Sequence, residues 1–365
     1  MSRYIIIGIS LLLVFIAGFF IMRTMQEDTI RLPQGGDTTK ETIVIQDGQV
    51  LGTEKEVDMQ EVQVKNEDKG RVEMKEIMVT DGIRHSIPLD EIRGGGPPKD
   101  GIPSIDQPTF ISPAEANTWV KDTEPGIAFS KGGTHRFYPY QVLVWHELVN
   151  DTVEGQRVLI SYCPLCLTGV VFDPIVQGER VEFGTSGKLW QSNLVMYDRK
   201  TDTLWSQVLG EAIVGDLTGT MLKTLPSDQV LYGKWKEQHP DGEVLSKDTG
   251  VVRLYGTSPY GSYFDVQNFS LQMVSKTDAR IPNDAFVFGI VENGKAKAYA
   301  VESIKEKGEV EDMFEGATFI LRHDPDLDVV RMAKRNSDGR EERINPLSGF
   351  WCSWVAAHPD TELYK

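Results

Sequence analysis

The chain has 365 residues and a mass of 40.9 kDa, enough for one large domain or two ordinary ones with a well-buried core. Its 54 acidic and 38 basic residues give a formal net charge of −16, which argues against nucleic acid as a partner because phosphate binding needs a basic face. With 3 cysteines, the chain is not a disulfide-dense secreted scaffold.

An uncharged apolar segment near the N-terminus, residues 4–22 from Tyr4 to Met22, predicts a transmembrane helix. At about 1.5 Å per residue this segment would span roughly 28 Å, close to the hydrocarbon thickness of a bilayer. A cleaved signal peptide is the alternative, but no small-residue cleavage site precedes Arg23. We therefore expect residues 1–23 to be a single-pass anchor in the cell membrane, with a cytoplasmic N-terminus and an extracytoplasmic main domain.

The next segment, residues 24–93, is polar, acidic and poor in aromatic residues. It contains strand-like pieces at residues 41–46, 57–64 and 71–79 but no large apolar cluster, so we predict a partly ordered stalk. Residues 94–103 (GGGPPKDGIP) are too rich in Gly and Pro for regular structure. The main domain, residues 94–365, is expected to begin there.

The sequence of this domain predicts a mainly β fold, a β-rich α+β architecture. Short apolar runs alternate with Gly, Asn and Asp turns, as at residues 158–162, 169–172, 194–197 and 286–291. Residues 199–202 read as the turn of a hairpin, and residues 184–189 (GTSGKL), which lack the spacing of a phosphate-binding loop, read as a turn between strands. Only two helical pieces stand out, at residues 231–238 and 349–357.

The endings of these two helices are the first sign of an internal repeat. Trp235, His239, Pro240 and Asp241 have the same spacing as Trp354, His358, Pro359 and Asp360. Upstream, an offset of 161 pairs Tyr138 with Tyr299 and Asp151 with Asp312. We predict two unequal repeats of β-strands, each closed by a short helix, at about residues 126–245 and 287–364. The histidines are expected to cap the helix C-termini, where positive charge is favourable.

The sharpest chemical signal is a C-x-x-C pair, Cys163 and Cys166, which only the first repeat carries. Such a pair has three interpretations: a redox couple, a metal-binding knuckle, or a structural disulfide of the kind found outside the cytoplasm. A thioredoxin-like couple needs a helix N-terminus to lower the thiol pKa, and the β-like runs on both sides of this pair weaken that interpretation.

A metal site needs further ligands, and His146 is the best third candidate. Met196, or else Met221, supplies a soft fourth ligand. Two thiolates, an imidazole and a thioether suit copper, with zinc as the alternative metal. The competing role for His146 is that of a hydrogen-bonded core residue.

Together these stretches resemble a bacterial and archaeal family known as domain of unknown function thirty-one seventy-nine. The resemblance covers about 270 residues, essentially everything after the stalk. The matching sequence segments are GGGPPKDGIP, YPYQVLVWHELVND, YCPLCLTGVVFD, FGTSGKLWQSNLVMYDRKTDTLW, GEAIVGDLTG and the closing residues 350–364. It implies an exported or membrane-anchored protein in which Cys163, Cys166 and His146 are family features without an assigned role. Cys352 stands where the resemblance leads us to expect an aromatic residue, and is interpreted as incidental.

The favoured function is a soft-metal site for copper, built by Cys163, Cys166 and His146 and used for metal handling or electron transfer, with small-molecule catalysis as a further role. One alternative is a thiol–disulfide redox protein that uses the same cysteines and does not need His146. The other is a non-catalytic binding or scaffold module in which the cysteines form a structural disulfide. The membrane is the one partner that the sequence predicts, and no substrate is identified.

Overall fold

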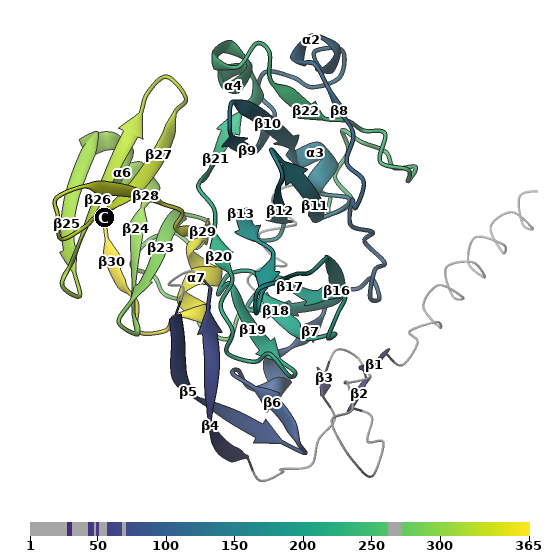
Figure 1. Cartoon of the computed structure of the whole chain (residues 1–365), viewed down its shortest axis with the longest axis vertical. Helices are drawn as coiled ribbons and strands as arrows, with labels where there is room; N and C mark the ends of the chain where they lie inside the picture. Colours follow the sequence, from purple (N-terminus) through teal and green to yellow (C-terminus); the bar gives the residue numbers. More distant parts are fainter. Residues whose placement is uncertain (1–27, 31–42, 47–48, 51–56, 68–70, 262–271) are drawn as a thin grey trace, which may run out of the picture.

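The computed structural model describes residues 28–30, 43–46, 49–50, 57–67, 71–261 and 272–365. These residues form a β-rich fold in which small sheets lie side by side in a propeller-like ring (Figure 1). The predicted transmembrane segment, residues 4–22, lies outside the described residues. Within the described part, no helix is long and apolar enough to cross a membrane.

The largest sheet has eight strands and joins the N-terminal hairpin to the centre of the molecule. Its strands in spatial order are β4 (Asp58–Asn66), β5 (Arg71–Thr80), β6 (Ile83–His85), β19 (Glu211–Val214), β18 (Leu204–Ser206), β17 (Asn193–Asp198), β16 (Phe183–Trp190) and β7 (Arg93–Gly94). The folded part therefore extends upstream of Gly94, where we expected it to begin. Ile77 and Val64, which look isolated in the polar sequence, are buried in this arrangement.

Two further sheets and three short helices complete the first half of the fold. One sheet contains β21 (Ser227–Leu231), β9 (Pro125–Lys131), β10 (Thr134–Pro139), β22 (Glu243–Leu245) and β8 (Phe110–Ile111), and the other contains β11 (Leu148–Val153), β12 (Gln156–Cys163), β13 (Thr168–Asp173) and β20 (Lys223–Thr224). The helices are α2 (Pro113–Ala116), α3 (Tyr140–Leu143) and α4 (Tyr232–Gln238). Ser112 and Glu115 form a capping box that starts α2.

Two four-stranded sheets and two helices make up the second half of the fold. Its sheets are β29 (Leu347–Phe350), β23 (Phe286–Glu292), β24 (Lys295–Ala300) and β30 (Glu362–Tyr364), and then β25 (Glu309–Phe314), β26 (Ala317–Asp324), β27 (Val329–Arg335) and β28 (Glu341–Ile344). Its helices are α6 (Val301–Lys307) and α7 (Trp351–Ala357).

The remaining elements are short. They are β1 (Asp28–Ile30), β2 (Ile43–Gln46), β3 (Gln49–Val50), the two-stranded pair β14 (Ile175–Val176) and β15 (Glu179–Arg180), and the 3-10 helix η1 (Leu89–Glu91).

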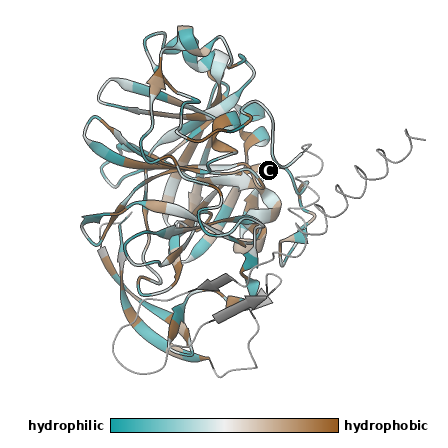
Figure 2. Cartoon of the chain, turned by 90° about the vertical axis from the view of Figure 1, so that its right-hand side faces the viewer, coloured by the Kyte–Doolittle hydropathy of each residue, from teal (hydrophilic) through white to brown (hydrophobic). Residues whose placement is uncertain are grey.

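The core consists of apolar side chains from the sheets, and in Figure 2 hydrophobic and hydrophilic residues are interspersed along the strands. Three tryptophans, Trp205, Trp235 and Trp351, are among the largest fully buried side chains. Burial of aromatic side chains is a major stabilising contribution in such a core.

Several local predictions are confirmed, and two need correction. The helices α4 and α7 form where expected, and His239 and His358 occupy their C-terminal cap positions. Burial lowers the pKa of His358 to about 4, so this residue is neutral and does not supply the positive charge that we expected. The run at residues 184–189 is a bulge inside β16 between Thr185 and Lys188, not a turn between strands, because the chain on both sides keeps pairing with β17.

The tightest packing in the second half joins β23 to α7. A Cβ atom at Gly289 would lie 2.2 Å from the ring of Trp354, although the backbone of Gly289 is not in the left-handed region. We therefore expect Gly289→Ala to lower the free energy of unfolding by about 1–3 kcal/mol through overpacking. Urea unfolding followed by tryptophan fluorescence measures this change.

The control is Val291→Ala in the same strand, where the side chain is 43% exposed and the expected loss is within about 0.5 kcal/mol. Equal losses of unfolding free energy in the two variants would show that any substitution in this strand is destabilising, and that the contact with Trp354 is not the cause.

Candidate functional site

The C-x-x-C segment is the connection between β12 and β13, as the sequence predicts. Cys163 is the last residue of β12 and pairs with Thr168, the first residue of β13. Leu167 closes the connection with a positive φ of 52°. Both thiols are free and buried, with Cys163 1% and Cys166 0% exposed.

Hydrogen-bond donors surround the sulfur of Cys166. The hydroxyl of Thr168 lies 3.0 Å from the Cys166 Sγ, and the Asn193 Nδ2 lies 3.1 Å from the same sulfur. The Oδ1 of Asn193 accepts a hydrogen bond from the backbone N–H of Val208, so the amide nitrogen must point toward the sulfur. The Nδ2 also donates to Gln207 Oε1, which holds the amide in place.

These donors give the two cysteines opposite electrostatic environments. Burial alone would raise the pKa of Cys166, but hydrogen bonds from the Cys163 thiol, Thr168 and Asn193 outweigh it and lower the pKa to about 7. Burial and the hydrogen bond to Cys166 raise the pKa of Cys163 well above its usual range. Of the two cysteines, Cys166 is therefore the one whose thiolate is stabilised, and Cys163 is the one that stays protonated.

A buried carboxyl group adjoins this pair. Glu147 follows α3 in the left-handed region, with φ 59°, and its backbone carbonyl accepts the N–H of Tyr162. Burial raises the pKa of Glu147 to about 7, the hydroxyl of Tyr260 partly offsets this by donating to Oε1 at 3.0 Å, and the charge of Cys166 raises it further. A carboxyl group with this pKa can take up and release a proton at neutral pH.

The second half of the chain closes the site from the other side. The backbone N–H of Phe350 donates to the carbonyl of Cys166 at 2.9 Å. A Cβ atom at Gly349 would lie 2.5 Å from the Thr168 hydroxyl, so only glycine lets β29 approach this closely. Cys352 joins the same apolar cluster, and burial, followed by the charge of Cys166, raises its pKa to about 12.

The other predicted ligands lie in different settings. Met196 is fully buried in the apolar cluster that contains Cys163 and Cys166. His146 instead contacts the Pro103 carbonyl through Nδ1 and the Tyr255 hydroxyl through Nε2, each at 2.7 Å. Since a carbonyl can only accept, Nδ1 carries the proton, and burial lowers the pKa of this histidine.

The cysteine pair therefore lacks the further ligands that a metal site needs. Among the residues that the structure describes, no three His, Cys, Asp or Glu side chains form a group that could hold a metal ion. His146 would have to give up one of its two hydrogen bonds to become a ligand. A site built from Cys163, Cys166 and His146 stays a prediction.

Thr168, Asn193, Gln207 and Glu147 are the residues that sequence reasoning missed. The available signal was weak: Asn193 and Glu147 are each the last residue of a short polar stretch that precedes an apolar run. Nothing in the sequence shows that Asn193 faces a cysteine some thirty residues upstream.

Comparison with known proteins gives a family and no activity. Residues 99–346 match the family model described as "Protein of unknown function (DUF3179)". No curated protein and no solved structure matches the chain.

The hydroxyl of Thr168 is the donor to Cys166 that is simplest to remove. We expect Thr168→Val to raise the pKa of Cys166 from about 7 to about 8 or above, because a hydrogen bond to a charged group contributes about 1.5–3 kcal/mol. The measurement is the ultraviolet absorbance of the thiolate against pH, with Cys166→Ser as the baseline.

The matched control is Thr218→Val, at a buried threonine that bonds to the carbonyls of Arg84 and Gly215. This substitution should leave the midpoint of the Cys166 thiolate titration unchanged. An unchanged midpoint in Thr168→Val as well would mean that the Thr168 hydroxyl does not stabilise the thiolate.

Proposed function

The chain belongs to the DUF3179 family, whose function is unknown, and we propose from the site alone that it is a thiol–disulfide redox protein. Cys163 and Cys166 form the redox couple, and Glu147 transfers the proton. This role was the first alternative to a metal site on sequence grounds, and the surroundings of Cys166 now favour it.

The observation that carries the proposal is the pair of hydrogen-bond partners at the sulfur of the fully buried Cys166, the Thr168 hydroxyl at 3.0 Å and the Asn193 Nδ2 at 3.1 Å. A buried structural cysteine is ordinarily inert, with a raised pKa, as Cys352 illustrates. Cys166 departs from this because Thr168, Asn193 and Cys163 all donate to its sulfur. Side-chain donors here take the place of the helix N-terminus whose absence weakened the redox interpretation.

The reaction follows from the two environments. The Cys166 thiolate attacks one sulfur of a disulfide RSSR, the S–S bond breaks, and the first thiolate RS⁻ leaves and is protonated by solvent. Glu147 accepts the proton of Cys163, whose sulfur then attacks Cys166 in the mixed disulfide. The second RS⁻ leaves and takes the proton from Glu147. Two electrons pass to RSSR, giving one protein disulfide and two RSH.

The burial of both thiols limits the class of substrate. Cys163 and Cys166 are almost completely enclosed, so any disulfide reaches their sulfurs only after a local rearrangement. We propose a low-molecular-weight disulfide as the substrate class, because it requires a smaller opening than a folded protein does.

The predicted location fits this chemistry. If residues 4–22 anchor the protein with its main domain on the extracytoplasmic face, the cysteine pair works where disulfides form and persist. We also propose that the two halves are an internal duplication in which only the first has the C-x-x-C pair.

Three equivalences support the duplication. Tyr138 donates to Asp151 at 2.6 Å, and Tyr299 donates to Asp312 at 2.8 Å. The parallel pair β10–β22 corresponds to the parallel pair β24–β30. In each half the tryptophan of the closing helix, Trp235 or Trp354, stands four residues before the histidine cap.

A second candidate is a soft-metal site, and the position of Met196 favours it. Its thioether lies in the apolar cluster of Cys163 and Cys166, and thiolate with thioether selects Cu(I). His146 would be a further ligand only after losing a hydrogen bond to Pro103 or Tyr255.

The redox couple predicts a change in thiol count. Of the 3 thiols in the reduced, denatured chain, we expect one to remain after treatment of the folded protein with glutathione disulfide. Cys352→Ala should keep the couple, whereas Cys163→Ser and Cys166→Ser should each abolish it. Elemental analysis of the same samples tests the other candidate.

Stoichiometric copper that blocks oxidation and disappears in Met196→Leu or His146→Ala would replace the redox proposal with the metal site. An unchanged count of 3 thiols in metal-free protein would contradict the redox proposal.

Glu147→Gln tests the proton transfer. The variant should form the disulfide at least about tenfold more slowly at neutral pH, because removing a general base typically costs about 10²–10⁴-fold when proton transfer limits the rate. Quenched-flow alkylation measures this rate.

The same variant has a stability signature. The folded pKa of Glu147 is about 7 against 4.5 for the free side chain, so the folded state binds the extra proton, and its stability falls as pH rises from 4.5 to 7. The loss is on the order of 3 kcal/mol. Glu147→Gln should remove this dependence, and a variant that keeps it would show that another group is responsible.

A further inference from the structure

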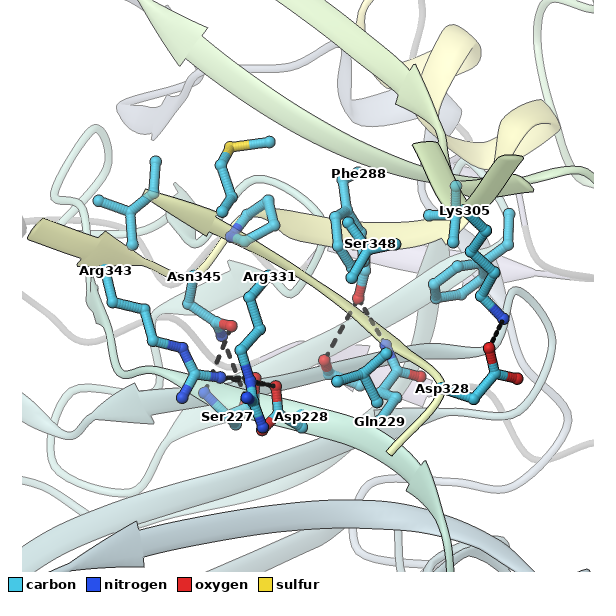
Figure 3. Close-up of a pocket in the computed structure, with 18 of the residues that line it drawn as sticks. Ser227, Asp228, Gln229, Phe288, Lys305, Asp328, Arg331, Arg343, Asn345 and Ser348 are labelled. Atoms are coloured by element: carbon cyan, nitrogen blue, oxygen red, sulfur yellow. Dashed lines mark hydrogen bonds and ion pairs between the residues drawn. The ribbon is translucent and has the colours of Figure 1, made fainter. Parts of the chain in front are cut away.

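A cavity of about 250 Å³ lies away from the cysteine sulfurs, between strand β21 of the first half and strands β27, β28 and β29 of the second (Figure 3). Allowing about 30 Å³ for each water, it has room for roughly eight water molecules. This is the size of a small organic ligand. The two ends and two walls of the cavity differ in chemistry.

One wall is apolar and comes from the second half. Its side chains are Phe286, Phe288, Val301, Val330, Met332 and Ile344. An apolar wall of this kind binds the hydrocarbon or aromatic body of a ligand.

The facing wall is polar, but its groups largely satisfy one another. Gln229 donates to the Ser348 hydroxyl at 2.6 Å and accepts from Tyr140. Asn345 bonds to both the backbone N–H and the hydroxyl of Ser227. These residues shape the cavity and leave few polar groups for a ligand.

The open donors lie at one end, where two arginines share one carboxylate and the side chain of Arg343 is 40% exposed. Arg331 donates to Asp228 through Nη2 at 2.8 Å, and Arg343 donates to the same side chain through Nη2 at 2.6 Å. Arg331 is further engaged by Asp324 at 2.8 Å. The Nε and Nη1 of Arg343, in contrast, have no hydrogen-bond acceptor among the described residues.

The opposite end carries charges that are already paired. Lys305 lies 3.0 Å from Asp328 and 3.8 Å from Glu302, and these carboxylates are 52% and 81% exposed. Solvent and salt screen charges at such exposure. Lys305 is therefore already paired with two carboxylates, whereas Arg343 keeps two donors without an acceptor among the described residues.

We propose that this cavity is a binding site for a small organic carboxylate. The carboxylate accepts hydrogen bonds from the open Nε and Nη1 of Arg343, and the apolar body packs on Phe286 and Phe288. A planar guanidinium matches a carboxylate in two parallel hydrogen bonds, which a neutral amide cannot reproduce. The site is independent of the redox proposal, since no cysteine lines the cavity.

The experiment is isothermal titration of the purified full-length chain with phenylacetate, phenylacetamide and 2-phenylethylammonium. Phenylacetate should bind at least about tenfold more tightly than the other two, because only it places an anion at Arg343. Arg343→Gln should weaken phenylacetate binding by about tenfold or more. Val301→Phe should abolish binding by filling the space.

The matched control is Arg340→Gln, at an arginine that is 83% exposed and pairs with Asp338 away from the cavity. Its phenylacetate binding should equal that of the unsubstituted chain, and thermal melting should show all variants to be folded. Equal affinity for phenylacetate and phenylacetamide would overturn the proposal. So would an absence of binding in the folded chain, which would leave the two arginines as a structural link between the halves.

Discussion

The antiparallel pairing of β12 with β13 is the constraint on which the site depends. Because Cys163 pairs with Thr168, the four residues between them must turn inside the protein, and both sulfurs enter an apolar cluster. A buried thiol would ordinarily be protonated and inert. The strand pairing also places the Thr168 hydroxyl against the sulfur of Cys166, so the same geometry that buries the thiol supplies a donor to its thiolate.

The remaining parts of the site are supplied by elements that must be positioned independently. Asn193 comes from the eight-stranded sheet, and its amide is oriented by Val208 and Gln207. Glycine at position 349 lets the second half approach Thr168 and hydrogen-bond to the carbonyl of Cys166 through Phe350. The second half therefore has a structural role at the cysteines although it lacks a C-x-x-C pair of its own.

The contact between the halves has two different characters. Near the cysteines it is apolar and close-packed, whereas between β21 and β27 it is polar and leaves a cavity. Two arginines of the second half meet one aspartate of the first there; the aspartate is 12% exposed and the arginines are 32% and 40% exposed. The Nε and Nη1 of Arg343 are left open in this cluster, and they are the donors that we propose for a bound carboxylate.

The sequence alone predicts the β-rich class, the two helices that end at His239 and His358, the turn that carries Cys163 and Cys166, and the family. These features depend on local patterns: alternating apolar residues, glycine and asparagine turns, and characteristic spacings. The protonation of Cys166 and Glu147 and the position of His146, in contrast, depend on the tertiary structure. The pKa of Cys166 depends on Asn193, that of Glu147 on its burial and Tyr260, and the position of His146 on Pro103 and Tyr255. Each of these is set by which distant strands and loops pack together, because desolvation and hydrogen bonding act through space and leave no periodic trace along the chain.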